Sequence, residues 1–274
     1  MAGSFREAEH TGWTTRAEGY DALFTSITDQ AIEPILSALG DLTGRTLLDV
    51  CCGPGDLAAE AKARGASATG IDFAETMVGL ARTKHPGIPF RVGDAERLPV
   101  PDSAVDHVVC AFGLMHLERP DAAIAEGFRV LRPGGTYAFT QLAMDDELLR
   151  VVSDAVAAHG STDVHLPPGP PLMRFGDPDE CRRTLEAHGF SAVRVRRLEL
   201  TWRAQRAESL LDLIYSGAVR AAMLLEAQPA DRRERIHQAI VKAVSAGSEG
   251  VVLRRPVLLA AGTRPPISQV AHLT

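Results

Sequence analysis

The sequence lacks several features that would assign it to a class of protein at once. Its 274 residues include no run of about 20 apolar residues, which argues against a membrane-spanning helix. The opening segment, MAGSFREAEHTGW, has no apolar stretch typical of a secretory signal, so we expect a cytoplasmic protein. The cysteines show neither CxxC pairs nor zinc-ligand spacing, which indicates buried free thiols in a reducing compartment and no metal site. They are Cys51, Cys52, Cys110 and Cys181.

An excess of positive charge is also absent. The chain has 29 Lys and Arg against 35 Asp and Glu, and only three of the basic residues are lysines. A net charge of -6 argues against a nucleic-acid binder, because such a protein needs a basic face. With 45% hydrophobic and 23% charged residues, the composition is typical of a folded globular protein. The length is ample for a core that needs no disulfide or metal to hold it.

The middle of the chain, residues 45–142, alternates short apolar runs with helical patterns. This alternation predicts βαβ crossovers and a mainly parallel sheet that is covered on both faces. The turn Arg132-Pro133-Gly134-Gly135 is expected to end the last helix of this part. The expected strands are 46–51, 66–72, 89–92, 105–111 and 136–140, and the expected helices are 56–64, 75–84 and 122–131.

The two flanking parts are predicted to be more helical. Residues 1–44 are expected to form an N-terminal helical lid, and residues 143–274 to form capping helices and the last strands of the same domain. In the second part, the proline-rich segment 166–171 indicates a loop, and Asp177-Pro178 is typical of a helix start. The remaining expected elements are a strand over 192–202, helical stretches over 207–226 and 229–246, and a final strand over 256–261.

The residues that could bind a ligand or take part in a reaction lie at the carboxyl ends of the expected strands. Ligands of doubly wound sheets bind at these ends. The first strand leads into Gly53-Pro54-Gly55, where glycines let the backbone approach a ligand closely. The second ends at Asp72, whose carboxylate can accept both hydroxyls of a ribose, and the third at Asp94, which can read an adenine edge with a neighbouring N–H. A dinucleotide site is disfavoured because the third glycine of GxGxxG is missing, and phosphate transfer because no Walker lysine follows.

Four segments in this order resemble the class I S-adenosylmethionine-dependent methyltransferases, in particular the ubiquinone/menaquinone-biosynthesis group. They are LLDVCCGPGDLA (47–58), GIDFAETMVGLAR (70–82), VGDAERLPVPDSAVDHVVCAFGLMHL (92–117) and FRVLRPGG (128–135). The match covers about a third of the chain strongly, and GWTTRAEGYD (12–21) resembles the lid helix of the group more loosely. The resemblance implies a Rossmann-like α/β fold with a seven-stranded, mostly parallel sheet, an N-terminal helical lid and a C-terminal helical insert.

The resemblance also implies S-adenosylmethionine as cofactor, S-adenosylhomocysteine as product, and a role for each matching residue. Asp49 and the backbone at Cys51, Gly53 and Gly55 would hold the methionine part, although the family usually has glycine in place of Cys51. The other expected cofactor residues are Asp72 for the ribose, Phe73 and Met77 beside the adenosine, Asp94 and Ala95 at the adenine, Ala111 and Phe112 under the sulfonium, and Tyr20 closing over the methionine end. A reactive-thiol role for Cys51 or Cys52 is the weaker hypothesis, because free cysteines are usually small buried hydrophobes.

Methyl transfer needs a base only when the nucleophile must lose a proton. His116, at the end of the fourth strand, is the best candidate for such a catalytic base, and His159 and His165 are weaker ones. The expected acceptor pocket is small and fairly apolar, although each of its residues alone is more often part of a core. Its candidate residues are Trp13, Met115, Met173, Phe175, Trp202 and Tyr215.

The sequence therefore predicts a methyltransferase acting on a small molecule, with O-, N-, C- or S-methylation left open. One alternative is a non-methylating reaction on the same scaffold, such as a cyclisation, and another is a cofactor-binding protein without turnover. A macromolecule methyltransferase is disfavoured by the acidic balance, and the basic strand Arg194-Val195-Arg196-Arg197 is interpreted as an exposed edge. A homodimer remains open, with the helical tail as one possible surface.

Overall fold

A computed structural model describes residues 4–244 and 250–266. The strands are β1 (Thr46–Val50), β2 (Ser67–Asp72), β3 (Phe90–Val92), β4 (Val105–Ala111), β5 (Leu131–Leu142), β6 (Ser191–Ala204) and β7 (Val251–Thr263). The α-helices are α1 (Phe5–Gly19), α2 (Thr25–Thr28), α3 (Ile32–Leu39), α4 (Asp56–Ala63), α5 (Glu75–Lys84), α6 (Pro120–Val130), α7 (Glu147–His159), α8 (Pro178–Ala187), α9 (Ser209–Gly217), α10 (Val219–Glu226) and α11 (Ala230–Ala243). Four short helical turns complete the set: η1 (Tyr20–Phe24), η2 (Asp29–Ala31), η3 (Leu114–His116) and η4 (Arg174–Gly176).

The chain divides into two compact units, and each is built from several segments. The sheet unit consists of residues 29–144, 170–198 and 257–274, and the helical unit of residues 1–28, 145–169 and 199–256. These bounds cut across the three parts expected from the sequence, because the N-terminal segment contributes to both units. The division at residues 44 and 142 stays a prediction.

The sheet has the strand order β3-β2-β1-β4-β5-β7-β6, which is the doubly wound arrangement expected from the sequence. Strands β1 to β5 pair in parallel, with Asp49 beside Gly70 on one side and beside Val109 on the other. Strand β7 pairs antiparallel with β5, with Leu142 opposite Val257. The order reverses between β1 and β4, so the carboxyl ends of these two strands flank the switch point where such sheets bind ligands.

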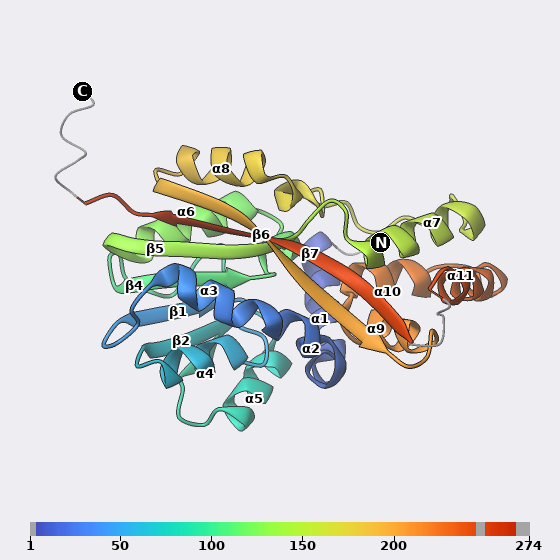
Figure 1. Ribbon diagram of the computed structural model, residues 1–274, viewed down its shortest axis with the longest axis horizontal. Coiled ribbons are helices and arrows are strands. Elements are labelled where there is room, and N and C mark those ends of the chain that lie inside the picture. The colour runs from blue at the N-terminus through green and yellow to red at the C-terminus, as the bar shows by residue number, and fades with distance from the viewer. Residues whose placement is uncertain (1–3, 245–249, 267–274) are drawn as a thin grey trace. The chain divides into compact units, whose positions relative to one another are not determined.

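Helices cover both faces of the sheet in this unit: α6 and α8 lie on one face, and α3, α4 and α5 on the other (Figure 1). The core under α6 and α8 is rich in aromatic side chains, and Tyr137 and Phe139 of β5 are almost fully buried in it. Phe190 joins this cluster with its ring centroid 5.5 Å from that of Tyr137. The packing fixes β5 against the helices and so fixes the carboxyl end of β5 at the ligand edge.

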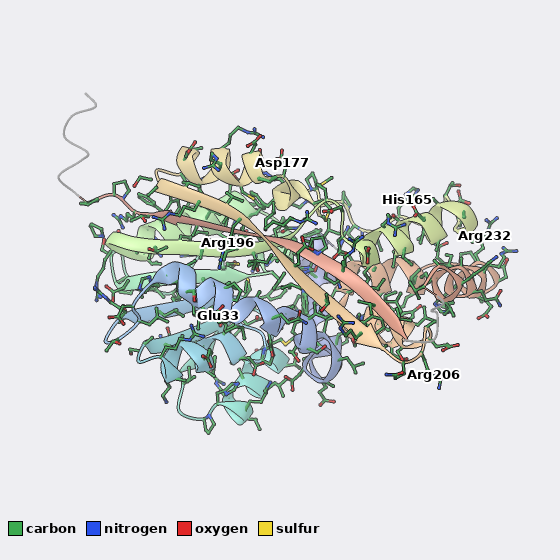
Figure 2. All side chains as sticks on the ribbon, in the orientation of Figure 1. Glu33, His165, Asp177, Arg196, Arg206 and Arg232 are labelled. Carbon is green, nitrogen blue, oxygen red and sulfur yellow. The ribbon has the colours of Figure 1, made fainter. Side chains whose placement is uncertain are left out.

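Local sequence signals set the ends of α8 as predicted. Asp177 accepts a hydrogen bond from the backbone N–H of Asp179 at its N-cap, and Pro178 occupies the first helical position. Gly189 follows the helix with φ +88°, a conformation that favours glycine. The edge position of β6 agrees with the sequence as well, since Arg194, Arg196 and Arg197 are all exposed. Arg196 (Figure 2) donates a hydrogen bond to the carbonyl of Pro34 at 2.6 Å.

The helical unit is held by close helix–helix contacts and one buried ion pair. Gly12 of α1 faces α10 so closely that a Cβ there would lie 2.3 Å from a Val219 methyl carbon. Asp146 caps α7 by accepting from the N–H of Leu149, and its other oxygen accepts from Arg255. Both side chains of this pair are almost completely buried.

Three expectations about element bounds are wrong. The final strand, expected over 256–261, already begins at Val251. The helical stretch 207–226 is broken, because Ala218 leaves the helical region with ψ +70° and separates α9 from α10. The segment Arg132 to Gly135 belongs to β5, which already begins at Leu131, so the helix before it ends without the help of these residues. Gly134 adopts φ +83° and lets the strand bend there. The end of the predicted stretch 229–246 lies outside the described residues.

Candidate functional site

The turn after β1 combines three left-handed residues with a buried carboxyl group. Asp49 is 1% exposed, and its Oδ2 atom has no hydrogen-bond partner in the described part of the chain. Burial, and secondly the nearby Asp72, raise the pKa of Asp49 well above its usual range, although the backbone N–H of Ala58 partly opposes this. A donor that carries positive charge, such as the ammonium group of an amino acid, would satisfy both the oxygen and the charge.

Cys51 adopts φ +58° immediately after β1, and Gly53 and Gly55 follow with φ +50° and +89°. This left-handed conformation explains why the resembled family usually has glycine where this chain has Cys51. A hydrogen bond with Cys110, and then burial, raise the pKa of the Cys51 thiol well above its usual range. A raised thiol pKa means little thiolate, so the chemistry does not favour the reactive-thiol hypothesis.

Asp72 ties the end of β2 to the β1 turn. Its Oδ2 accepts from the backbone N–H of Gly53 at 3.0 Å, and its Oδ1 accepts from that of Ala74 at 2.9 Å. Burial raises the pKa of Asp72, while these backbone donors and the charge of His116 lower it. A carboxylate oxygen can accept a second hydrogen bond, so this group stays suited to ribose hydroxyls.

The remaining expected cofactor residues on β2 and β3 follow the same edge. Phe73 is half-buried directly after Asp72, and Met77 of α5 is 2% exposed. Asp94 accepts from the N–H of Glu96 at 2.9 Å, which shapes the turn after β3. Ala95 in this turn is buried. Each expected residue therefore stands at the carboxyl end of a parallel strand or in the helix that follows.

The end of β4 meets the β1 turn directly. Phe112 has φ +57°, and its N–H donates to the Oγ1 atom of Thr140 at 3.1 Å. A Cβ at Gly113 would lie 2.6 Å from the Cβ of Cys51, so only glycine fits between the two turns. The next residues form η3, which ends at the half-buried His116. His116 is near enough to Asp72 for its charge to lower the pKa of that carboxyl group, so the two residues lie at the same edge of the sheet.

The expected acceptor residues of the sheet unit differ in their surroundings. Met115 is 9% exposed in η3, and Met173 is half-buried before η4. Phe175 lies in the core, with its ring centroid 5.4 Å from that of Phe139, so its position suits packing. The sequence analysis missed Thr140 and Gln141, two buried polar residues at the end of β5. Their residue types alone do not predict burial, because polar side chains near the end of a strand are usually exposed to solvent.

Other expected residues belong to the helical unit. Tyr20 begins the π-helical turn η1. Its ring centroid lies 5.3 Å from that of Trp13 and 5.5 Å from that of Phe24. Trp202 is 8% exposed on β6. The two weaker base candidates also lie here: His159 ends α7, and His165 is exposed in the following loop (Figure 2).

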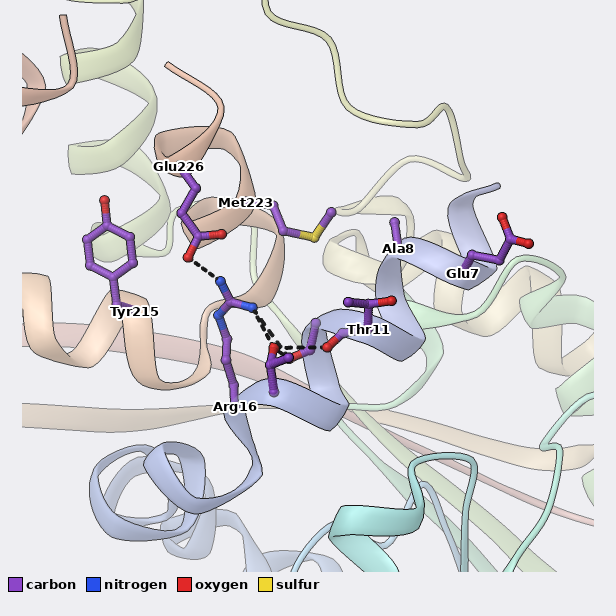
Figure 3. Close-up of a pocket in the computed structure, with 9 residues that line it drawn as sticks. Glu7, Ala8, Thr11, Arg16, Tyr215, Met223 and Glu226 are labelled. Carbon is purple, nitrogen blue, oxygen red and sulfur yellow. Dashed lines mark hydrogen bonds and ion pairs between the residues drawn. The ribbon is translucent and has the colours of Figure 1, made fainter. Parts of the chain in front are cut away.

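A pocket of about 750 Å³ opens in the helical unit (Figure 3). Arg16 crosses it and donates to Glu226 at 2.5 Å, so the charges of these two residues compensate each other. Tyr215 lines the pocket and its hydroxyl is 2.8 Å from Nε2 of His237. The other lining residues are Glu7, Ala8, Thr11, Gly12, Thr15 and Met223. None of the other expected site residues is among them.

The described part of the chain comprises residues 4–244 and 250–266. No group of His, Cys, Asp and Glu side chains there is arranged to hold a metal ion. None of the helices in those ranges is long and apolar enough to cross a bilayer.

Comparison with known proteins points to one family. The methyltransferase domain family matches residues 48–139. The demethylmenaquinone methyltransferase of Deinococcus radiodurans is 32% identical over 165 residues, which is 53% of this chain and 68% of that protein. The C-methyltransferase UbiE of Cupriavidus metallidurans is 44% identical over 34% of this chain and 41% of its own length. A malonyl-acyl-carrier-protein O-methyltransferase of Serratia marcescens is 32% identical over 50% of this chain and 54% of its own length.

Solved structures agree on the fold. The YcgJ protein of Bacillus subtilis superposes with a TM-score of 0.59 at 17% identity, over 86% of this chain and 99% of that chain. The cyclase SpnF superposes with a TM-score of 0.51 at 20% identity, over 87% of this chain and 81% of its own. At these identities the likeness shows the fold alone.

Proposed function

The chain belongs to the class I S-adenosylmethionine-dependent methyltransferases of the ubiquinone/menaquinone-biosynthesis group, and we propose that it methylates a small, fairly apolar acceptor. The observation that carries the cofactor part is the unpartnered Oδ2 of Asp49 beside the left-handed turn at Cys51. It lies at the carboxyl end of β1, next to the reversal of strand order, where this fold takes its ligand.

We propose that the residues at this edge each bind a different part of the cofactor. Asp49 binds the ammonium end together with the backbone at Cys51, Gly53 and Gly55. Asp72 binds the ribose, beside Phe73 and Met77. Asp94 and Ala95 face the adenine, and Ala111 and Phe112 lie under the sulfonium. Tyr20 of the helical unit is proposed to close over the methionine end.

S-adenosylmethionine supplies a methyl group that is already activated by its positive sulfur. The residues of the chain then have to align the nucleophile and exclude water, so orientation supplies most of the rate enhancement. We propose that His116 accepts the proton that the acceptor loses, since a neutral imidazole is a suitable base near neutral pH.

The acceptor is proposed by chemical class. The printed names of relatives include demethylmenaquinone and ubiquinone/menaquinone C-methyltransferases, and also an O-methyltransferase. Their alignments cover from 41% to 68% of the relatives' own lengths. A hydroquinone-like aromatic ring is therefore the acceptor class to test first, with a ring carbon as the methylated atom.

The experiment is transfer of a labelled methyl group from S-adenosylmethionine into a small-molecule extract of the source organism, read by mass spectrometry. A labelled product, absent with an Asp72→Ala variant, supports methyl transfer and gives the mass of the acceptor. Cofactor binding without any labelled product would instead favour a non-methylating reaction such as a cyclisation, or a protein without turnover. Cofactor affinity that does not change in Asp72→Ala would contradict the proposed ribose site.

We also propose a cytoplasmic location, which is supported by the four free cysteines, all of which lie in the described part of the chain. A homodimer is proposed as the state to test by light scattering.

A further inference from the structure

The inner row of β5 ends in a buried amide. Alternate residues of a strand face the same side of the sheet, so Tyr137, Phe139 and Gln141 form one row. All three are at most 2% exposed. The first two pack in the aromatic core, and Gln141 takes the last position of the row at the carboxyl end. An amide is a costly choice for a buried position, where an apolar side chain would continue the packing.

The amide nitrogen of Gln141 has hydrogen-bond partners, but the amide oxygen has none among the described residues. Its Nε2 donates to the carbonyl of Leu172 at 3.0 Å and lies 3.9 Å from the sulfur of Met115. The Leu172 carbonyl fixes the orientation of the amide, because two oxygens facing each other would repel. The Oε1 atom has no partner among residues 4–244 and 250–266. A buried acceptor left in this state is destabilising, so a missing donor is expected.

A contact with Met115 links this amide to the site described above. Met115, which contacts the amide, precedes His116 in η3. Methionine is unbranched and flexible, so the side chain of Met115 beside the amide can adjust to a bound molecule. The amide therefore borders η3, the turn that ends at the proposed base His116.

We propose that Oε1 of Gln141 accepts a hydrogen bond from an O–H group of the methyl acceptor and thereby selects and orients acceptors that carry such a donor. This inference rests on the proposed function and assigns a residue to the recognition of the hydroxyl group of its acceptor. Gln141 is proposed to bind the acceptor, and His116 remains the proposed base that accepts its proton.

The test uses two probes that differ only in the donor. The wild-type protein, saturated with S-adenosylhomocysteine, is titrated anaerobically with 1,4-dihydroxynaphthalene and with 1,4-dimethoxynaphthalene. We expect the dihydroxy compound to bind about ten-fold more tightly, which is the effect of one buried hydrogen bond. Gln141→Met removes the oxygen at similar volume and is expected to abolish this preference. Its affinity for S-adenosylhomocysteine is expected to stay within about two-fold of wild type, a change too small to reflect a lost hydrogen bond.

A matched control is Gln228→Met, which changes a buried glutamine of the helical unit and is expected to keep the preference. If Gln141→Met does not fold, Gln141→Asn withdraws the oxygen by one methylene and carries the same expectation. Equal binding of both probes to the wild type, or an unchanged preference in the Gln141 variants, would overturn the inference. Probe selectivity without methyl transfer to any acceptor would leave the role of Gln141 standing and refute the proposed function alone.

Discussion

The buried position of Asp49 is expected to favour cofactor binding and to lower the stability of the cofactor-free protein. Its carboxyl group is buried with an unpartnered oxygen, and its pKa in the folded protein is raised. Because the folded state holds this proton more tightly than the unfolded state, ionisation costs stability. The free energy of unfolding is therefore expected to fall as pH rises from the ordinary carboxyl range through the raised pKa.

Asp49→Asn is expected to remove this cost and to weaken the cofactor at the same time. Without cofactor, the variant should be more stable than the wild type at about pH 8, and the difference should shrink towards about pH 4. Its affinity for S-adenosylhomocysteine should fall about ten- to a hundred-fold, the loss expected for a hydrogen bond to a charged group. Denaturant unfolding and calorimetry measure the two effects. Unchanged affinity would show that Asp49 does not hold the ammonium end.

Cys51 permits a test of backbone conformation at the same turn. At φ +58°, glycine relieves strain but adds freedom to the unfolded chain, so Cys51→Gly should change the free energy of unfolding by less than about 1 kcal/mol. Cys51→Val places a β-branched side chain in a left-handed conformation and should cost about 1–3 kcal/mol. Cofactor affinity should be kept by the first variant and lowered by the second. A valine variant that matches the wild type in both measurements would contradict this account.

Single residues also show the limit of what the sequence reveals. The positions of the glycines, Asp72 and Asp94 at strand ends were predictable from the apolar runs before them, and their roles toward a ligand stay predictions. Gln141 was not predictable, because glutamine at a strand end is usually solvated. Only the packing of β5 against the aromatic core shows that its amide is buried.

At the scale of elements, two glycines distinguish packing from helix propensity. Gly70 of β2 lies under Phe90, and an added Cβ would be 2.4 Å from the ring. At Gly79 of α5, an added Cβ would meet no atom within 4 Å apart from its own helix backbone and chain neighbours. Gly70→Ala should therefore lower the free energy of unfolding by about 1–3 kcal/mol, and Gly79→Ala should raise it by about 0.5–1 kcal/mol. Thermal or denaturant unfolding of the two variants measures these changes. A Gly79→Ala variant that is less stable than the wild type would contradict the open surroundings assigned to this position in α5.

The parallel strands of the sheet were predictable from apolar runs bounded by turns, and α5 and β4 were predicted with their observed bounds. The break at Ala218 was not predictable, because the residues on both sides of it favour a helix. Tertiary packing decides where α9 ends. Strand β5 begins earlier than predicted because Pro133 and Gly134, which usually end elements, are accommodated at its entry by a register shift against β4.

At the scale of the whole molecule, the expected cofactor residues lie in the sheet unit with one exception, Tyr20. No sequence pattern marks this division, because three segments build each unit and two of the boundaries fall inside the continuous strands β6 and β7. Hydrogen exchange can test the assignment without knowledge of the acceptor. A ligand at about 100 times its Kd stabilises the states that bind it by about 2.7 kcal/mol, which slows exchange wherever opening releases the ligand.

Saturating S-adenosylhomocysteine is therefore expected to slow exchange at the ends of β1, β2 and β4 by up to about a hundred-fold. Helix α11 contains none of the expected residues and serves as the internal control, with no change expected. The turn η1 decides the role of Tyr20: slower exchange over Tyr20–Phe24 is the expected result, because a residue that closes over the cofactor must be released before that turn can open. Protection of the three strand ends with η1 unchanged would remove Tyr20 from the site and leave the cofactor to the sheet unit. Equal protection of α11 would mean that binding stabilises the whole chain as one cooperative unit, and the assignment of individual residues would then have to come from variants such as Asp49→Asn.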